Sequence, residues 1–392
     1  MDTLDILKRL IAFPSVFTAP DYADITDFAI SVLEPLGVIC HRLEAPGGGR
    51  AGLFARTGPA GPGGIMLSAH LDVVPVTGQD WSTDPFVATE RDGRIFGRGT
   101  SDMKGFAAAA IRAMAEAARR PLAHPLKLAL SYDEEAGCIG ISDMIGSLAQ
   151  TIGRPDLCIV GEPTSMRIVT GHKGKISYRV SVSGSAGHSA SAPDHVNALH
   201  LACDYVAALR QMQSELAGSG LRADGYTVPY STIHVGKLSG GNALNMIPEA
   251  AIVEFEIRHL AGEDIASLVN RLEVVASDIA AAARRHRREA SIEMTEFNRY
   301  PGFDMASDRA IRFLESIGGR LPDGKVDYGT DGGVIATAGV PTLVCGPGDI
   351  ARAHKADEYI AVDELAECDE FLTKVLDALE LSSSLKGLAA SP

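Results

Sequence analysis

Histidines and carboxylates stand just beyond several apolar runs of this sequence, where isolated polar groups cost free energy unless they have partners. The candidates are His70, Asp72, Asp102, Asp133, Glu134, Glu135, Glu162 and His354. A cluster of carboxylates raises its own pKa values steeply unless cations compensate the charge. Two histidines with several carboxylates therefore favour a two-metal site with nitrogen and oxygen ligands. Zinc suits this ligand set best, with cobalt as the alternative.

Each of these residues taken alone also has an ordinary structural interpretation. His70 would be a hydrogen-bonded core histidine, His354 a surface residue, and Asp102 the N-cap of the helix that follows it. The metal-site interpretation rests on their common position, because ligands of an open α/β sheet bind beyond the carboxyl ends of its strands. We expect no cysteine thiolate nearby, so the site should be catalytic, with open positions for water and substrate, and not a closed structural zinc site.

Two other classes of function are disfavoured by the same residues. The loop GRGTSD begins like a dinucleotide-binding fingerprint, but Asp102 stands at its last position, where its charge would repel a pyrophosphate. A nucleotide-binding oxidoreductase is therefore disfavoured. A non-catalytic binding module should have lost some of the candidate ligands, and all of them are present.

The elements that must position these residues fall into two kinds. The first half alternates apolar strand patterns with helical ones, as α/β proteins do. After about Lys175 the strands alternate strictly between apolar and polar residues, which is typical of a sheet exposed on one side. Their order with two helices, β-α-β-β-α-β, is that of a ferredoxin-like unit. The sequence thus predicts an α/β domain in two pieces, with an α+β domain inserted between them. The expected ranges are 1–175 and 291–392 for the α/β domain and 176–290 for the insert.

Composition limits the class of protein further. The chain has 392 residues, 46% of them hydrophobic and 22% charged, which is typical of a soluble globular protein of two domains. It has no apolar run long enough to span a membrane and no signal peptide, so we expect a cytoplasmic protein. The net charge of −14 argues against nucleic acid as a partner. The six cysteines are scattered without a CxxC pair, which favours free thiols, most of them buried.

Five segments occur in the order expected for one family of enzymes. They are SAHLDVVP, GRGTSDMKG, DEEAGCIG, GEPT and AHKADEY. They resemble the successive signatures of the M20 family of metallopeptidases and deacylases, and the resemblance covers nearly the whole chain. The family fold is a catalytic α/β domain with a central mixed sheet and a dinuclear metal site, interrupted by a lid and dimerisation domain. The resemblance therefore implies a homodimer formed through the inserted domain.

The resemblance also implies how the metal ions are held. Asp102 would bridge two divalent cations, zinc or cobalt. His70 and Glu162 would bind one of them, and Glu135 and His354 would bind the other.

The remaining roles implied by the resemblance are catalytic or concern the substrate. Glu134 would be the general base, and Asp72 the carboxylate that orients the metal-binding histidine two residues before it. Residues i and i+2 of a strand share a face, which independently supports this last assignment. In the inserted domain, His188 would reach the active site of the partner subunit. Asn245 and Arg258 would contact the carboxylate of the substrate.

Within the family, the segments MKGF, YGTDGG and CGPGDIARAHKADEY are most similar to the acetylornithine deacetylases. This similarity implies an amidohydrolase that removes the acetyl group from N2-acetyl-L-ornithine in arginine biosynthesis. The reaction would proceed by attack of a hydroxide bridging the two metal ions. The alternatives are deacylation of another N-acyl amino acid, such as acetylcitrulline or succinyl-diaminopimelate, and a dipeptidase of the same family.

Overall fold

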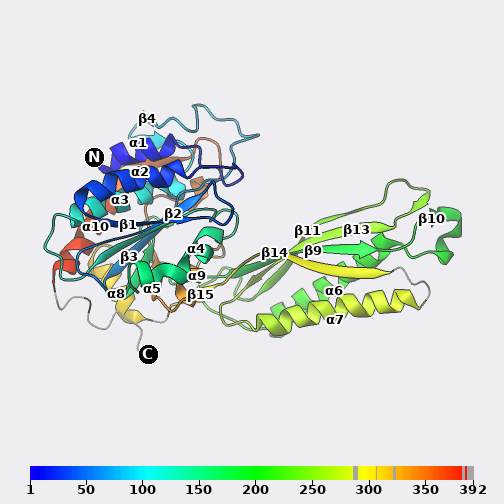
Figure 1. Ribbon diagram of the computed structural model, residues 1–392. Helices are drawn as coiled ribbons and strands as arrows, with labels where there is room; N and C mark the ends of the chain where they lie inside the picture. Colours follow the sequence, from blue (N-terminus) through cyan, green and yellow to red (C-terminus); the bar gives the residue numbers. More distant parts are fainter. Residues whose placement is uncertain (286–289, 306, 321–323, 382–384, 386–392) are drawn as a thin grey trace. The chain divides into compact units, whose positions relative to one another are not determined.

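The structure, a computed structural model, describes residues 1–285, 290–305, 307–320, 324–381 and 385. It divides into two compact units, Met1–His172 with Phe303–Pro392, and Lys173–Gly302 (Figure 1). The first boundary lies close to the expected one at 175. The second differs from the expected boundary at 290, because strand β14 (Ser291–Tyr300) pairs with strand β9 (Gly174–Ser183) of the inserted unit.

A six-stranded mixed sheet forms the centre of the first unit, which has the α/β fold expected from the sequence. The strand order is β1-β2-β6-β3-β7-β16. The last four strands in this order run parallel to one another, whereas β2 runs antiparallel to its two neighbours. Their bounds are Ile39–Glu44 (β1), Ala51–Thr57 (β2), Leu126–Ser131 (β6), Ile65–His70 (β3), Leu157–Val160 (β7) and Thr342–Val344 (β16).

Helices surround this sheet (Figure 1). The alanine-rich helix α3 is buried along most of its length, and it contacts α1, α10 and the strands β2, β3 and β6. Helix α4 contacts β2 and β6, and α9 contacts β7 and β16. The helix bounds are Thr3–Ile11 (α1), Asp24–Leu33 (α2), Gly105–Ala117 (α3), Ile139–Met144 (α4), Leu148–Thr151 (α5), Asp308–Ser316 (α8), Gly332–Thr337 (α9) and Val362–Glu380 (α10).

Two small sheets complete the first unit. One has the order β17-β5-β4 and the other pairs β15 with β8. Their bounds are Thr89–Arg91 (β4), Arg94–Phe96 (β5), Tyr359–Ala361 (β17), Gly171–His172 (β8) and Phe303–Asp304 (β15). Because β17 pairs with β5, a segment near the end of the chain lies beside the loop that leads to Asp102.

The second unit has the predicted ferredoxin-like arrangement. Its four-stranded antiparallel sheet has the order β11-β13-β9-β14, and helices α6 and α7 pack against each other and against the strands (Figure 1). The short strands β10 and β12 pair separately. The further bounds are Gly187–His188 (β10), Ala198–Ser219 (α6), Thr232–Gly240 (β11), Met246–Ile247 (β12), Ala250–His259 (β13) and Ile265–Arg284 (α7).

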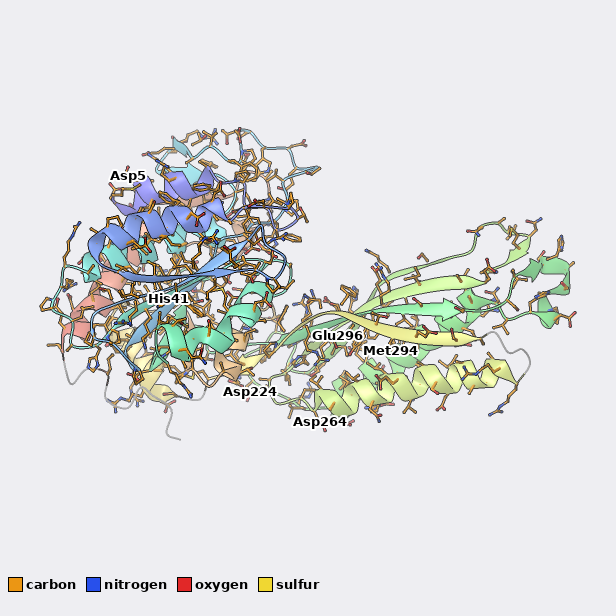
Figure 2. All side chains as sticks on the ribbon, in the orientation of Figure 1. Asp5, His41, Asp224, Asp264, Met294 and Glu296 are labelled. Carbon is orange, nitrogen blue, oxygen red and sulfur yellow. The ribbon has the colours of Figure 1, made fainter. Side chains whose placement is uncertain are left out.

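The sequence pattern explains the core of this second unit. The alternating residues Ile176, Tyr178, Val180 and Val182 of β9 are all buried in one apolar cluster with residues of α6 and α7. Figure 2 labels Asp264 at the start of α7, where its side chain accepts a hydrogen bond from the Ser267 N–H at 3.0 Å. This is the N-cap that the first turn of a helix requires.

Two further sequence expectations concern the whole chain. All six cysteines are free thiols, and four of them are buried. Within the described residues, no helix combines the length and the apolarity needed to cross a bilayer.

Candidate functional site

The carboxyl ends of three parallel strands supply most of the candidate residues. His70 is the last residue of β3, Glu134 and Glu135 follow β6, and Glu162 follows β7. Because β6, β3 and β7 are neighbours in the sheet and run parallel, these ends meet at one edge. Asp102 joins them from the loop before helix α3.

Two groups of possible metal ligands form at this edge, and they share one residue. His70, Asp102 and Glu162 offer ligand atoms within 4.8 Å of one another, and so do Asp102, Glu135 and His354. The Oδ1 atom of Asp102 lies 3.1 Å from His70 Nε2, and its Oδ2 atom lies 3.2 Å from His354 Nε2. Asp102 is thus oriented toward both groups, as a bridging carboxylate requires.

The hydrogen bonds of the histidines indicate what would occupy these groups. The Nδ1–H of His70 donates to the backbone carbonyl of Asp72 at 3.0 Å, so the neutral ring presents a lone pair at Nε2. That lone pair faces the carboxylate of Asp102, which is also an acceptor. His354 Nε2 similarly lies 3.0 Å from Glu135 Oε1. At His70, two acceptors that face each other at this distance require a proton or a cation between them, and the ligand atoms of both groups fit divalent metal ions.

Burial and like charge raise the proton affinity of this site. Burial raises the pKa of Glu134 and of Glu162 well above the usual range, and neighbouring carboxylates add to the effect. Hydrogen bonds to Asp102 and Glu135 raise the pKa of His354 to about 10. Burial lowers the pKa of His70, but Asp102 and Asp72 outweigh it and hold that pKa well above its usual value. The metal-free site therefore holds protons that cations would displace.

Comparison with known proteins agrees with this geometry. A model of the peptidase family M20/M25/M40 matches residues 66–378 of the chain. The chain belongs to this family. Acetylornithine deacetylase of Proteus mirabilis (strain HI4320) is 31% identical to it over 390 residues, which are 98% of each protein. The family resemblance seen in the sequence is confirmed, and the chain is a metal-dependent hydrolase of the M20 family.

Solved structures of the M20 family have the same fold. A metallo-carboxypeptidase from Sulfolobus solfataricus gives a TM-score of 0.78 at 18% identity, covering 96% of this chain and 99% of its own. A dinuclear metal-binding peptidase from Bacillus subtilis gives 0.69 at 13% identity, covering 96% and 97%.

The structure gives Asp72 a different contact from the one predicted for an orienting carboxylate. The backbone carbonyl of Asp72, and not its carboxylate, accepts the His70 N–H; the carboxylate Oδ1 lies 3.6 Å from Nδ1. The two carboxylate oxygens instead accept the backbone N–H groups of Glu134 and Glu135, each at 3.0 Å. Asp72 is fully buried. Its side chain therefore holds the turn after β6, and the i, i+2 spacing could not distinguish between these two contacts.

Two residues of this M20 site are absent from the predicted set. Glu134, Cys138 and Asp331 form a third group whose polar atoms lie within 4.8 Å of one another. Cys138 Sγ lies 3.5 Å from Glu134 Oε1, and burial raises the pKa of this thiol well above its usual value, so the nearby cysteine is a thiol and not a thiolate ligand. The buried Asp331 accepts a hydrogen bond from Ser131 Oγ at 2.5 Å, and burial raises the pKa of this carboxyl to about 6.

The signals for these two residues were present in the sequence. Cys138 lies four residues after Glu134 in DEEAGC, and the turn folds back so that the Cys138 N–H donates to the Glu134 carbonyl. Asp331 lies in YGTDGG, directly before helix α9. Its contact with Ser131 at the end of β6 could not be predicted, because the two residues are 200 positions apart in the sequence.

The three predicted residues of the inserted unit lie in two places. His188 and Asn245 are close together, because β10 pairs with β12 and the Ser189 N–H donates to the Asn245 carbonyl at 3.0 Å. Both side chains are exposed. Arg258 stands near the far end of β13, about 26 Å along an eight-residue stretch of strand from Ala250.

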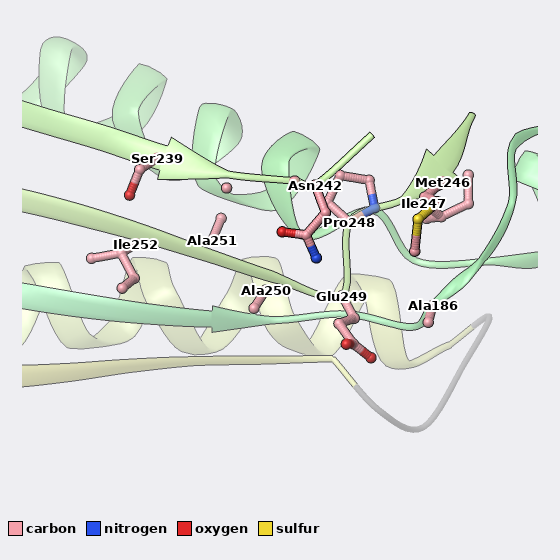
Figure 3. Close-up of a pocket in the computed structure, with 12 residues that line it drawn as sticks. Ala186, Ser239, Asn242, Met246, Ile247, Pro248, Glu249, Ala250, Ala251 and Ile252 are labelled. Atoms are coloured by element: carbon pink, nitrogen blue, oxygen red, sulfur yellow. The ribbon is translucent and has the colours of Figure 1, made fainter. Parts of the chain in front are cut away.

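The surroundings of these residues differ as well. A pocket of about 270 Å³ lies beside the β10–β12 pair and is lined by residues that include Ala186, Asn242, Met246 and Glu249 (Figure 3). The guanidinium of Arg258 donates to Glu256 at 3.0 Å and to the Tyr300 hydroxyl at 2.7 Å. The second unit thus does not bring Arg258 together with the other two residues.

Proposed function

We propose that the protein hydrolyses the amide bond of an N-acyl amino acid, and that N2-acetyl-L-ornithine is its substrate. The observation that carries the proposal is the 31% identity to an acetylornithine deacetylase over 98% of both chains. The convergence of two histidines with three carboxylates, in two groups that share Asp102, supports the reaction type. The product, ornithine, would serve arginine biosynthesis.

The proposed metal ligands are those whose polar atoms converge. Asp102 would bridge the two ions, with His70 and Glu162 on one side and Glu135 and His354 on the other. Zinc is the proposed metal, with cobalt as the alternative, because imidazole and carboxylate ligands suit these ions. Bound divalent cations act as Lewis acids toward a carbonyl oxygen and lower the pKa of a nearby water.

Glu134 is the proposed general base. Burial raises its pKa, so this carboxyl accepts a proton more readily than an exposed one, as a general base must. It would accept a proton from the attacking water as the new C–O bond forms. It would then give this proton to the amide nitrogen as the C–N bond breaks, so that acetate and the free amine leave.

We further propose that two copies of the chain cooperate through the inserted unit. His188 would stabilise the negative charge on the carbonyl oxygen in the active site of the partner. Asn245 lies beside His188 and would act from the same copy, with its side-chain amide toward the substrate carboxylate. Because Arg258 is separated from Asn245 along β13, it would bind the same carboxylate from the other copy, with a guanidinium that is well shaped for it.

A substrate panel tests the reaction and its specificity. The zinc- or cobalt-loaded protein is assayed with N2-acetylornithine, acetylcitrulline, succinyl-diaminopimelate and a dipeptide. We expect acetylornithine to be preferred, and activity to disappear on chelation and return with metal. Full activity after exhaustive chelation would refute the metal-dependent reaction. Preference for another substrate would refute the specificity alone.

Mixed dimers test the cooperation of two copies. Glu134→Gln should lower the rate by about 10²–10⁴-fold, and His188→Ala should also be inactive. When the two variants are combined at random, half of the dimers carry both, and each of these has one intact site. About a quarter of the wild-type activity should then return. No recovery, in mixtures shown to contain the mixed dimer, would place His188 in its own subunit's site or outside catalysis.

A further inference from the structure

The loop that carries Asp102 is held by a single buried carboxylate from a distant part of the chain. Glu358 Oε1 accepts the backbone N–H groups of Ser101 and Asp102, at 2.9 and 3.1 Å. Its Oε2 accepts the Gly99 N–H at 3.1 Å. The Glu358 carbonyl also accepts the Gly97 N–H at 3.0 Å. Successive N–H groups that point to one centre form an anion-binding nest, and here the anion is a side chain of the protein.

The conformation of this loop requires a glycine. Gly99 has φ of 87°, in the left-handed region that other residues rarely adopt, and a Cβ there would lie 2.8 Å from Val73 Cγ1. The turn is what directs the N–H groups inward to Glu358. The Asp102 backbone is therefore fixed by Glu358 directly, at the residue whose side chain faces both histidines.

An arginine completes the contact and connects it to the second histidine. Arg98 Nη1 donates to Glu358 Oε2 at 2.6 Å, and each of these two side chains is only 1% exposed. The same Nη1 lies 3.3 Å from the Lys355 carbonyl, next to His354. Arg98 Nη2 donates to Gln79 Oε1 at 2.6 Å, and Gln79 Nε2 donates to the His354 carbonyl at 2.8 Å.

We propose that Glu358, together with Arg98, is the positioning residue of the metal centre, tying the loop of Asp102 to the loop of His354. This inference rests on the proposed metal-dependent function, because it gives Glu358 a role only through those two ligands. Glu358 touches neither the candidate ions nor the substrate. It fixes the backbone from which the bridging carboxylate extends, and its partner Arg98 fixes the backbone around His354.

The chemistry of the pair explains why a carboxylate is needed here. An uncharged acceptor with one oxygen cannot satisfy three N–H groups and an arginine at once, and charge-assisted hydrogen bonds are roughly twice as strong as neutral ones. Partners that orient metal ligands typically contribute about 10–100-fold to metal affinity or activity. Removing the charge of Glu358 should therefore weaken metal binding without removing a ligand.

The test is a metal titration of the Glu358→Gln variant. Metal-free wild type and variant are titrated with Zn²⁺ by calorimetry, and folding is checked by near-UV circular dichroism. We expect the affinity of the variant to fall by about 10–100-fold. Because Asp102 faces both ligand groups, the loss should affect both ions.

Asp369→Asn is the matched control. Asp369 accepts hydrogen bonds from Arg112 Nε at 3.0 Å and from Thr3 Oγ1 at 2.7 Å in the same unit, neither of them a proposed ligand, so this variant also loses a charged partner of an arginine. It should lose stability and keep wild-type metal affinity.

Each outcome decides the proposal. Wild-type affinity in Glu358→Gln would overturn it, whatever the stability of that variant. If Glu358→Gln does not fold, Arg98→Lys decides, because it leaves the three backbone bonds to Glu358 in place and loosens the contact of residue 98 with Glu358 and with the loop of His354. Weaker binding in that variant supports the proposal, and unchanged binding overturns it. Wild type that binds no zinc would refute the proposed function instead.

Discussion

Replacing Asp72 with asparagine tests the contact that the structure assigns to this side chain. In the wild type each carboxylate oxygen accepts one backbone N–H at 3.0 Å, from Glu134 and Glu135. An asparagine has one acceptor oxygen, so one of the two N–H groups must face the side-chain NH₂. A buried donor left without a partner costs about 1–3 kcal/mol. If the binding of one metal ion loses the same ~1–3 kcal/mol, its affinity falls by about 5–150-fold.

The effect should fall on one of the two proposed metal positions. His70 keeps its hydrogen bond in the variant, because that bond is to the backbone carbonyl of residue 72. The turn that carries Glu135 loses its anchor. Zinc titration of metal-free Asp72→Asn should therefore show one ion bound with nearly wild-type affinity and one ion bound about 10–100-fold more weakly.

A second substitution identifies the weakened position. Adding His354→Ala to Asp72→Asn should leave the tight ion unchanged, because His354 belongs to the group of Glu135. Asp143→Asn is the control, since it makes the same exchange at a carboxylate that accepts a hydrogen bond from the Tyr132 hydroxyl at 2.8 Å and holds neither backbone N–H of the turn. Equal weakening of both ions, or loss of the His70 ion first, would show that Asp72 acts on His70 after all.

Three more predictions follow from the same contacts. Burial and the neighbouring carboxylates raise the pKa of Glu162, and hydrogen bonds raise that of His354 to about 10. Metal binding should therefore release protons and become stronger as the pH rises. Calorimetric heats of metal binding that do not depend on the protonation enthalpy of the buffer would contradict this. Cys138→Ala should lower kcat by up to about 10-fold by removing a hydrogen bond to Glu134, whereas Cys138→Ser should retain most of it, as steady-state kinetics would show. Burial lowers the pKa of His259 in the folded protein. As the pH drops, this histidine is therefore protonated in the unfolded chain before it is protonated in the folded protein, and the free energy of unfolding should fall below about pH 6.5. Urea unfolding of His259→Asn at several pH values should show a weaker dependence on pH.

The sequence predicted the parts of the fold that depend on periodicity. The alternating residues of β9 face the core of the second unit, and the apolar runs before His70 and Glu162 are parallel strands whose ends meet. These patterns reflect local burial, which is visible in one segment at a time. The domain boundary predicted at 290 differs from the observed one at Gly302 for a related reason. Strand β14 completes a sheet that began more than a hundred residues earlier, and only the pairing shows to which unit it belongs.

The missed residues of the site depend on contacts between distant segments. Asp331 meets Ser131 from 200 residues away, and Glu358 meets the loop of Asp102 from more than 250 residues away. Neither contact has a periodicity that a single sequence could reveal. Spacing placed Asp72 on the correct face, but it could not show whether the carbonyl or the carboxylate meets the histidine.

Asp102 is the point at which these distant contacts converge, and this has a consequence for the energetics of the site. Its side chain faces histidines 70 and 354, and its backbone is bonded to Glu358. The contacts exist only when strands from both pieces of the first unit are in place, so cations at this site would bind the folded unit and not the unfolded chain. Such binding adds about 2.7 kcal/mol of stability at a free ion concentration of 100 Kd. Binding of the ions that the reaction requires would therefore also stabilise the fold of the first unit.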